Sequence, residues 1–455
     1  MTRPRNDAAS ARGIAWDILL AVERGRFADA ELGRRLARGG LDPRDQALLT
    51  QLVYGTLAWQ GWLDFLIRRC GRSPDTIDLP IRVLLRLALF QLTKLSRIPE
   101  FAAVDTAVSL SKSFHKGAAS GFVNASLRRF VREREHLTLP DPNSESAGDL
   151  ALAWSHPRWL VEHWLAELGP ADTRALLAAD NEAAPTVLRV NRLRVEREEL
   201  LTSLAAAGVS ARPTQYAPHG IVLESGCDPS RLRGFAEGLF SIQGEASQLV
   251  TLLLGPKAQQ RLWDACAAPG GKSTYLAELI GDEGHVLATD TNAKGLQSVR
   301  ANALRLGLTC IDPTVADATR LDTVVDPRAL FDAVLVDAPC SGLGTLRQHP
   351  EIRWRRTAAD LAALASRQRR LLDAVARRLA PRGALVYATC TIARVENERV
   401  IEEFLERQRD FSIVDPRPFL PPAAHALIDS AGVFRTFPHR HGLDGFFAVR
   451  LQRRD

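Results

Sequence analysis

Two cysteines stand in short motifs that each follow an apolar run of the sequence. Cys340 lies in APCSG after FDAVLVD, and Cys390 lies in ATCT after ALVY. Short apolar runs of this kind are typical of buried strands, so both thiols are expected at strand ends. A cysteine thiolate is the side chain best suited to attack an electron-poor carbon. The two motifs therefore predict a site for nucleophilic chemistry that contains both thiols.

The stretch DACAAPGGKST (264–274) has the Gly-Lys-Ser ending of an ATPase phosphate loop. Such a loop also requires glycine at position 266, where this chain has Cys266, and Pro269 lacks an N–H that could bind phosphate. These departures argue against an ATPase, which stays an alternative. A nucleoside ligand without phosphate fits better, because Gly270 and Gly271 allow close approach of the backbone to a ligand.

Three aspartates follow successive strand-like segments of the same region. Asp290 comes about 20 residues after the glycines, where a carboxylate can accept hydrogen bonds from ribose hydroxyls. Asp317 is placed to receive an adenine amino group, and Asp337 ends FDAVLVD. A single aspartate is more often a helix cap or a turn residue, but three in register at strand ends favour a ligand. S-adenosylmethionine has these groups and no phosphate, so it is the predicted cofactor.

The elements that position these residues follow three patterns along the chain. Apolar residues at spacings of three and four predict helices in the first part, for example IRVLLRLALFQLTKL. A helix and short strand-like pieces such as TVLRVNRL and GIVLES follow. Short apolar runs then alternate with helices, which predicts a mainly parallel, doubly wound sheet with ligands at the carboxyl ends of its strands. We expect an all-α domain over 1–138, a linker and small α+β connector over 139–236, and an α/β domain over 237–455.

Positive charge is concentrated in the first part of the chain. Residues 1–140 hold 22 Lys and Arg against 14 Asp and Glu, whereas the whole chain has a net charge of +6. A basic module of this kind favours an anionic partner such as nucleic acid. Arg128, Arg129, Arg132 and Arg134 of one helix form either a solvated helix face or a stripe that contacts phosphates. The candidates for a second contact with RNA phosphates are Arg347, His349, Arg353, Arg355 and Arg356 in LRQHPEIRWRR.

Other features narrow the class of protein. No apolar run approaches the roughly 20 residues that span a bilayer, and MTRPRNDAAS is no signal segment, so a cytoplasmic protein without membrane contact is expected. None of the cysteines has C-x-x-C spacing, which predicts free thiols and no metal. Cys70, Cys227 and Cys310 are expected to be small buried residues.

DACAAPGGKST, VDAPCSG and YATCT resemble the signature motifs of the Sun family of RNA cytosine-C5 methyltransferases. With FSIQGEASQLV (240–250) and DGFFAVRL, the resemblance covers nearly the whole chain, and the helical part is more loosely similar to NusB. It implies a Rossmann-like class I methyltransferase domain, preceded by an all-α NusB-like domain and a small α+β connector. The implied activity is S-adenosylmethionine-dependent methylation of a cytidine at C5 in small-subunit (16S) ribosomal RNA. A monomer is expected.

The resemblance also implies roles for individual residues. Cys390 would be the nucleophile that adds to C6 of cytosine, and Cys340 would aid release of the methylated RNA. The cofactor pocket would be lined by Cys266, Ala267, Ala268, Pro269, Gly270, Gly271 and Lys272, with Asp290, Asp317 and Asp337. A non-catalytic RNA-binding or ribosome-assembly factor remains an alternative, in which the basic helical part acts without the thiols.

Overall fold

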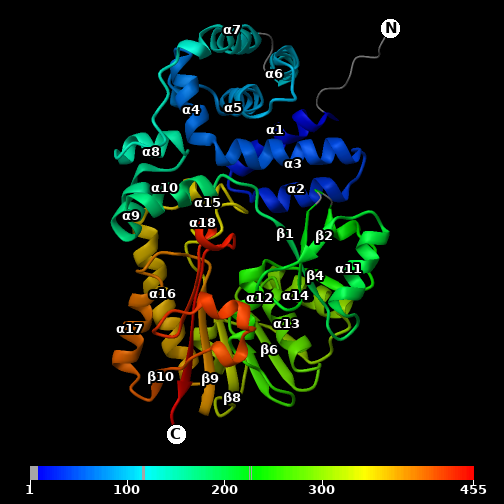
Figure 1. Ribbon diagram of the computed structural model, residues 1–455, viewed down its shortest axis with the longest axis vertical. Coiled ribbons are helices and arrows are strands. Elements are labelled where there is room, and N and C mark those ends of the chain that lie inside the picture. The colour runs from blue at the N-terminus through cyan, green and yellow to red at the C-terminus, as the bar shows by residue number, and fades with distance from the viewer. Residues whose placement is uncertain (1–8, 115–117, 225, 227) are drawn as a thin grey trace. The chain divides into compact units, whose positions relative to one another are not determined.

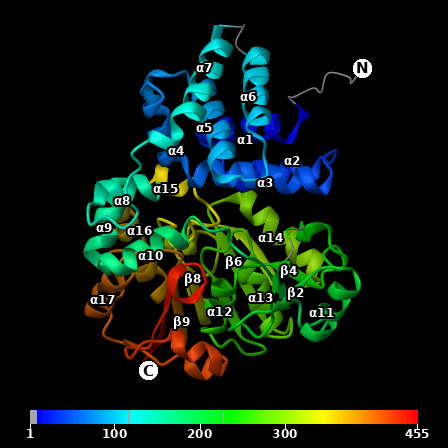
Figure 2. The same ribbon diagram turned by 45° about the horizontal axis from the view of Figure 1, so that its top comes forward.

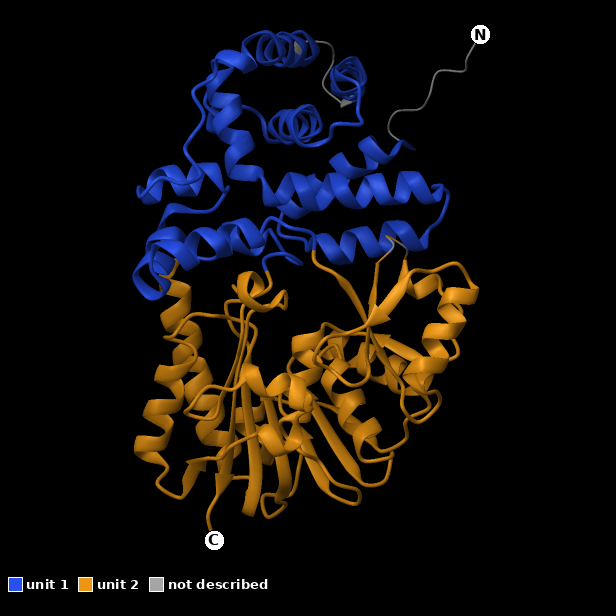
Figure 3. Cartoon of the chain, viewed as in Figure 1, with its two compact units in different colours: residues 1–183, 346–356 blue, residues 184–345, 357–455 orange. Residues whose placement is uncertain are grey.

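The computed structural model describes residues 9–455 except 115–117, 225 and 227. The chain forms two compact units (Figure 3), which we call the helical unit (residues 1–183 and 346–356) and the sheet unit (residues 184–345 and 357–455). The boundary therefore falls at 183/184, inside the expected connector. The short segment 346–356 packs with the helices although it comes from the middle of the expected α/β domain.

The helical unit is built around α5, which is buried along most of its length. Its residues Ile81, Val83, Leu84 and Leu87 are each at most 4% exposed, as expected for a central helix. This confirms the all-α pattern of the first part of the sequence (Figure 2). The helices are α1 (Ala11–Glu23), α2 (Ala28–Ala37), α3 (Pro43–Ala58), α4 (Gln60–Arg69), α5 (Leu79–Lys94), α6 (Glu100–Phe114), α7 (Ala118–Glu133), α8 (Ala147–Ala153), α9 (Arg158–Leu168), α10 (Pro170–Ala179) and the distant α15 (Ile352–Arg355).

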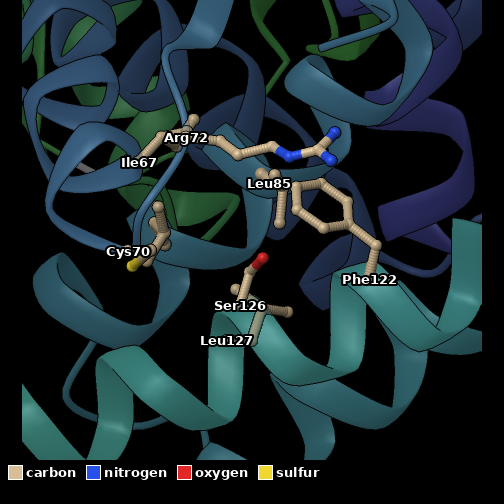
Figure 4. A pocket seen from close by; sticks show the side chains of 8 residues that line it. Ile67, Cys70, Arg72, Leu85, Phe122, Ser126 and Leu127 are labelled. Carbon is tan, nitrogen blue, oxygen red and sulfur yellow. The ribbon is translucent and has the colours of Figure 1, made fainter. Parts of the chain in front are cut away.

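A small cavity within the helical unit is lined by residues from α4, α5 and α7 (Figure 4). Its volume is about 10 Å³, which is room for about one water molecule and far too little for a nucleotide. Cys70 is among its lining residues and is half-buried, and burial raises the pKa of its thiol to about 11. Cys310 is likewise half-buried, so the two are less buried than expected. Cys227 lies outside the described residues.

The sheet unit begins with a small antiparallel sheet of order β2-β3-β1-β4, which confirms the α+β pattern expected in this region. Leu200 and Leu204 of helix α11 pack on Leu188, Ile221 and Phe240 of the strands. The elements are β1 (Thr186–Val190), α11 (Arg197–Ala206), β2 (Ala211–Pro213), β3 (Gly220–Leu223) and β4 (Phe240–Ile242).

The main sheet has the strand order β10-β12-β9-β8-β5-β6-β7, with β11 paired to β12. The pairs from β9 to β7 are parallel, whereas β12 runs antiparallel between β9 and β10, so the expected mainly parallel sheet is confirmed. Its elements are α12 (Glu245–Leu252), β5 (Arg261–Asp264), α13 (Gly271–Leu279), β6 (His285–Asp290), α14 (Ala293–Leu306), β7 (Ile311–Val315), β8 (Phe331–Asp337), α16 (Ala358–Ala376), β9 (Leu379–Thr389), α17 (Glu398–Arg407), β10 (Phe411–Ile413), β11 (Val433–Thr436), α18 (Pro438–His441) and β12 (Phe446–Arg453).

Helices cover both faces of this sheet (Figure 1). Leu262 and Val286 point to the layer that contains α12, α13 and α14. Their neighbours Trp263 and Leu287 point to the opposite layer, which contains α16 and α17. Successive residues of the strands are thus buried on alternate faces, which accounts for their continuous apolar runs.

The strand order reverses between β6-β5 and β8-β9, and this is where ligands bind in doubly wound folds. The strands there end at Asp264, Asp290, Asp337 and Thr389. The motifs DACAAPGGKST, DAPCSG and ATCT therefore all stand at the carboxyl ends of these strands. None of the helices among the described residues is long and apolar enough to cross a membrane.

Candidate active site

The two motif cysteines lie side by side. Cys340 follows β8 and Cys390 directly follows β9, and Asp337 pairs with Ala388 in the parallel ladder of these strands. Their Sγ atoms are 3.4 Å apart, and both residues are half-buried. The fold therefore brings the two thiols together at neighbouring strand ends, as expected.

Buried hydrogen bonds fix the two cysteine loops to each other. The hydroxyls of Ser341 and Thr391 are 2.8 Å apart, and the Gly344 N–H donates to the Cys390 carbonyl at 3.0 Å. These bonds join the loop after β8 to the loop after β9. The spacing of the two sulfur atoms is consequently set by the backbone of both loops.

Two further buried side chains hold the loop of Cys340. The Glu396 carboxylate accepts from Ser341 N–H and from the Gln368 amide, each at 2.9 Å, and Gln368 also donates to the Pro339 carbonyl at 3.0 Å. Glu396 and Gln368 are both 0% exposed. The sequence did not single them out, because neither lies in a recognised motif and their contacts join distant elements.

The pKa of the Cys340 thiol is raised by its surroundings. The hydrogen bond with Cys390 raises the pKa of Cys340 well above the ordinary thiol range, and burial and the charges of Cys390 and Glu396 raise it further. The raised pKa keeps the Cys340 thiol protonated at neutral pH, in direct contact with the Cys390 sulfur.

Lys272 and Asp337 form an ion pair beside the thiols, with Nζ and Oδ2 2.6 Å apart. Burial alone lowers the pKa of Lys272, but Asp337 and the charges of Cys390 and Asp264 outweigh this and raise it. Lys272 is thus a firmly charged ammonium that attracts a thiolate at Cys390. The side chain of Lys272 is 11% exposed and that of Asp337 is 28% exposed, so water only weakly screens the attraction between their charges.

Asp264 ends β5 under the same loop. Its Oδ2 accepts from the Ser273 hydroxyl at 2.6 Å, and it is 1% exposed. Burial raises its pKa to about 6, and the nearby Asp337 contributes in the same direction, while Ser273 and Lys272 lower it. The sequence motif contains Asp264, but nothing in its spacing distinguished it from a strand-end aspartate.

The loop 266–272 follows β5 and turns into α13. Gly270 has a φ of +109°, which a residue with a side chain rarely adopts, and an added Cβ would lie 3.0 Å from the Val299 Cα. Asp290 accepts from the Ala268 N–H at 3.1 Å and from the Asn292 N–H at 2.8 Å. The loop and the end of β6 are therefore joined directly.

Asp317 follows β7 and is exposed. Its Oδ1 accepts from the N–H and the hydroxyl of Thr319, and these bonds lower its pKa. Burial raises the pKa of the Cys266 thiol, as do the carboxylates of Asp264, Asp337 and Asp290 in that order. The thiol of Cys266 is therefore neutral and surrounded by acidic groups.

Arg189 of β1 reaches the first turns of α13 from the small sheet. It is 0% exposed and donates to the Gly271 carbonyl at 2.5 Å, the Thr274 hydroxyl at 3.0 Å and the Glu278 carboxylate at 2.7 Å. A fourth bond goes to Gln243. The start of α13, which carries Lys272, is therefore braced by the region that the sequence suggested was only a connector.

The expectation that the basic residues after Cys340 all contact RNA is wrong for Arg353. This side chain is 0% exposed and donates to the carbonyls of Ala58, Ser155 and Asp180 within the helical unit. Burial lowers its pKa to about 10. Arg355 is half-buried and donates to the Val22 carbonyl at 2.7 Å, and a phosphate contact stays a prediction for it and for Arg347, His349 and Arg356. The pattern was misread because a run of basic residues is the same in sequence whether it binds phosphate or carbonyl oxygens.

The expected arginine stripe lies exposed on α7 except for Arg134, which follows the helix and is half-buried, and the stripe is partly neutralised. Arg129 pairs with Glu133 at 2.9 Å, and Arg134 pairs with Glu100 at 2.6 Å. Arg128 and Arg132 are also exposed. A contact with phosphates remains a prediction for these residues.

Three family models match the chain in the order of its elements. They are described as "NusB family" over residues 9–132, "Methyltr_RsmF/B-like, ferredoxin-like domain" over 156–230, and "16S rRNA methyltransferase RsmB/F" over 251–452. These matches agree with the helices, the small α+β sheet and the doubly wound sheet. The fold is that of a methyltransferase domain preceded in sequence by a NusB domain.

Relatives match over almost the full length. "Probable ribosomal RNA small subunit methyltransferase B" of Synechocystis is 37% identical over 98% of this chain and 99% of its own. "Ribosomal RNA small subunit methyltransferase B" of Pseudomonas putida is 38% identical over 90% of this chain and 91% of its own. The crystal structure of PH0851 aligns with this chain over 100% of both chains, with a TM-score of 0.84 and 27% sequence identity. The chain belongs to the 16S rRNA methyltransferase RsmB/F family.

Proposed function

We propose that this protein methylates C5 of a cytidine in small-subunit ribosomal RNA, with S-adenosylmethionine as the methyl donor. Membership of the family supports a methyltransferase that acts on this RNA. The observation that supports the cytosine chemistry is the 3.4 Å contact of Cys340 and Cys390 beside the Lys272–Asp337 ion pair. C5 of cytosine is a weak nucleophile, and a nearby thiolate can activate it by adding to C6.

Cys390 is the nucleophile in this proposal. Its thiolate adds to C6, and the bond makes C5 electron-rich enough to take a methyl group. Loss of the C5 proton to water then restores the double bond and expels the Cys390 thiolate. Lys272 keeps positive charge beside the sulfur, which stabilises the thiolate before the addition and after the release.

Cys340 assists release. Its thiol holds a proton, as the raised pKa indicates, and it contacts Cys390 directly. A proton donated by Cys340 stabilises the departing Cys390 thiolate. Asp337 lies at the same edge, bonded to Lys272, and is the carboxylate best placed to contact the cytosine edge.

The residues at this edge fit S-adenosylmethionine. The positive φ of Gly270 lets loop 266–272 turn into α13 at the carboxyl ends of the strands, and Asp290 and Asp317 offer carboxylate oxygens at the ends of β6 and β7. When bound, the cofactor supplies an electrophilic sulfonium methyl group. The acidic surroundings of Cys266 suit a cationic sulfonium and do not suit phosphate, which argues against the ATPase alternative.

The test is transfer of labelled methyl groups from S-adenosylmethionine to protein-free small-subunit rRNA. We expect 5-methylcytosine with the wild type and none with Cys390→Ala. The Cys340→Ala variant should accumulate protein joined covalently to RNA, seen as a slow band in denaturing gels. Cys310→Ala, which changes a thiol distant from the motifs, is the matched control. Methylation that persists without Cys390 would refute the proposed nucleophile.

A non-catalytic RNA-binding factor makes a different set of predictions. It binds rRNA equally well with either cysteine replaced, and calorimetry detects no S-adenosylmethionine binding. A wild type that binds the cofactor but does not methylate naked rRNA would instead indicate a ribonucleoprotein substrate. The two outcomes are therefore distinguished by cofactor binding.

A further inference from the structure

We propose that Asp29, His349 and Glu351 bind a divalent transition-metal ion within the helical unit. One ligand atom from each residue lies within 4.8 Å of those of the other two. Asp29 is in the first turn of α2, and His349 and Glu351 belong to the segment 346–356, which packs with the helices (Figure 3). The cluster therefore joins two parts of the chain that are far apart in sequence.

Glu351 is the residue that points most clearly to a ligand. It is 2% exposed, and its Oε1 accepts from the Ala28 N–H at 3.0 Å. This bond caps α2, whose N-cap residue Phe27 provides no side-chain hydrogen bond. Its Oε2 is equally buried and has no hydrogen-bond partner in the part of the chain that the structure describes. Helix capping explains one carboxylate oxygen and leaves the other unpaired, which is costly for a buried anion.

The charges of the cluster lead to the same conclusion. Asp29 and Glu351 are both carboxylates, and neither forms an ion pair with any described residue. The hydrogen bond of Asp29 is local, from the Ala30 N–H to Oδ1 at 2.7 Å. Two carboxylates this close repel each other unless a cation lies between them. A metal ion would supply that charge and also satisfy the unpaired Oε2 of Glu351.

His349 decides the kind of cation. Imidazole nitrogen is a preferred ligand of zinc, iron, cobalt and related ions, whereas calcium and magnesium favour oxygen. One imidazole and two carboxylates provide three ligands and leave further positions for water, as in open zinc sites. Zinc and its spectroscopic substitute cobalt are therefore the ions to test.

The sequence could not reveal this cluster. The expectation of no metal rested on the absence of C-x-x-C spacing, but no cysteine takes part here. Asp29 is separated from the other two by about three hundred residues, so no local spacing relates them. The metal would fasten the segment 346–356 to α2, and this segment directly follows the loop that carries Cys340.

The experiment is a titration of the full chain with Co²⁺ and then Zn²⁺ after removal of metal by a chelator. The thiols of Cys340 and Cys390 are rival ligands, so the titration is repeated in a variant with both changed to Ser. We expect one Co²⁺ per chain in both proteins, with a visible spectrum free of sulfur-to-cobalt charge transfer. This readout does not depend on methyl transfer, so it is independent of the proposed function.

Variants of the three ligands complete the test. Asp29→Asn and His349→Ala should each weaken binding at least tenfold, and Glu351→Gln should do the same although its amide oxygen still accepts from Ala28. His136→Ala, which changes an exposed histidine of the same unit, should bind as the wild type does. Zn²⁺ at a hundredfold excess over Kd should raise the Tm of the wild type by about 5 °C and leave that of Asp29→Asn unchanged.

Two outcomes overturn the proposal. One is a wild type that binds no Co²⁺ or Zn²⁺. The other is binding that disappears in the double-cysteine variant or that is unaffected by Asp29→Asn. Asp29 is exposed, so this variant keeps the fold even if the changes at the buried Glu351 do not.

Discussion

Arg189→Met should strongly destabilise the sheet unit and weaken cofactor binding. The change removes a fully buried guanidinium and leaves Glu278, which is also 0% exposed, without its ion-pair partner. One oxygen of Glu278 already lacks a hydrogen-bond partner, so the carboxylate would be left nearly unpaired. Removing one partner of a buried pair costs about 3–5 kcal/mol. The lost bond to the Gly271 carbonyl also frees the first turn of α13, so S-adenosylmethionine should bind less tightly.

The cost should depend on pH in a defined direction. Burial raises the pKa of Glu278, and Arg189 opposes this rise. Without Arg189 the pKa of folded Glu278 rises further above its unfolded value, so the folded variant retains a proton that the unfolded chain has lost. Its stability is then fullest below the ordinary glutamate pKa and falls as pH rises toward the raised one. The difference between wild type and variant should therefore shrink in acid.

Urea unfolding and calorimetric titration with the cofactor measure both effects. The double variant Arg189→Met/Glu278→Gln removes the stranded charge and should regain most of the stability, but not the bond to Gly271. Arg192→Met changes an exposed arginine just after the same strand and should alter stability by no more than about 0.5 kcal/mol. A loss below 1 kcal/mol for Arg189→Met, with no rescue by Glu278→Gln, would refute the reasoning.

Three further predictions concern the site itself. Hydrogen peroxide should oxidise Cys340 and Cys390 to a disulfide, with water as the other product, because their sulfur atoms need only approach from 3.4 Å to about 2.05 Å. Mass spectrometry would detect the disulfide, and dithiothreitol should restore the activity lost on oxidation. Asp264→Asn should flatten the pH dependence of stability between about pH 4 and 6. Burial raises the pKa of Asp264 from 3.8 to about 6, so the wild type is stabilised by the protonated carboxyl and loses this stability as pH rises. The loss should amount to about 3 kcal/mol in urea unfolding. Lys272→Met should lower the rate of methyl transfer and shift the pH profile of that rate toward higher pH, because the ammonium no longer favours the Cys390 thiolate. A pH profile identical to that of the wild type would contradict this.

The paired thiols could be predicted from sequence because each follows a buried strand. An apolar run fixes a strand, and parallel strands bring their carboxyl ends to one edge, so Cys340, Cys390 and Asp337 had to converge. The parallel sheet was predictable for the same reason. The sequence also indicated the small α+β region, whose strands carry clear apolar patterns.

The side chains that hold the site in place were not predictable in this way. Arg189, Gln368 and Glu396 are polar residues that become fully buried, and each is paired with groups far away in the chain. Polar residues of this kind have the same pattern in sequence as exposed ones. Their burial is decided by partners that only the folded chain supplies.

The segment 346–356 shows where charge in a sequence misleads most. Read as a sequence, Arg353 and Arg355 form a basic run next to a nucleophilic loop, which favours a phosphate contact. In the fold, the Arg353 guanidinium donates to three carbonyl oxygens of the helical unit instead of to water. These acceptors keep the guanidinium charged although it is buried. A phosphate would have to displace those carbonyls and leave them unpaired, at a cost of about 1–3 kcal/mol for each. The loop of Cys340 thus continues into a segment in which Arg353 stabilises protein packing, so a contact of this segment with RNA would depend on its other basic residues.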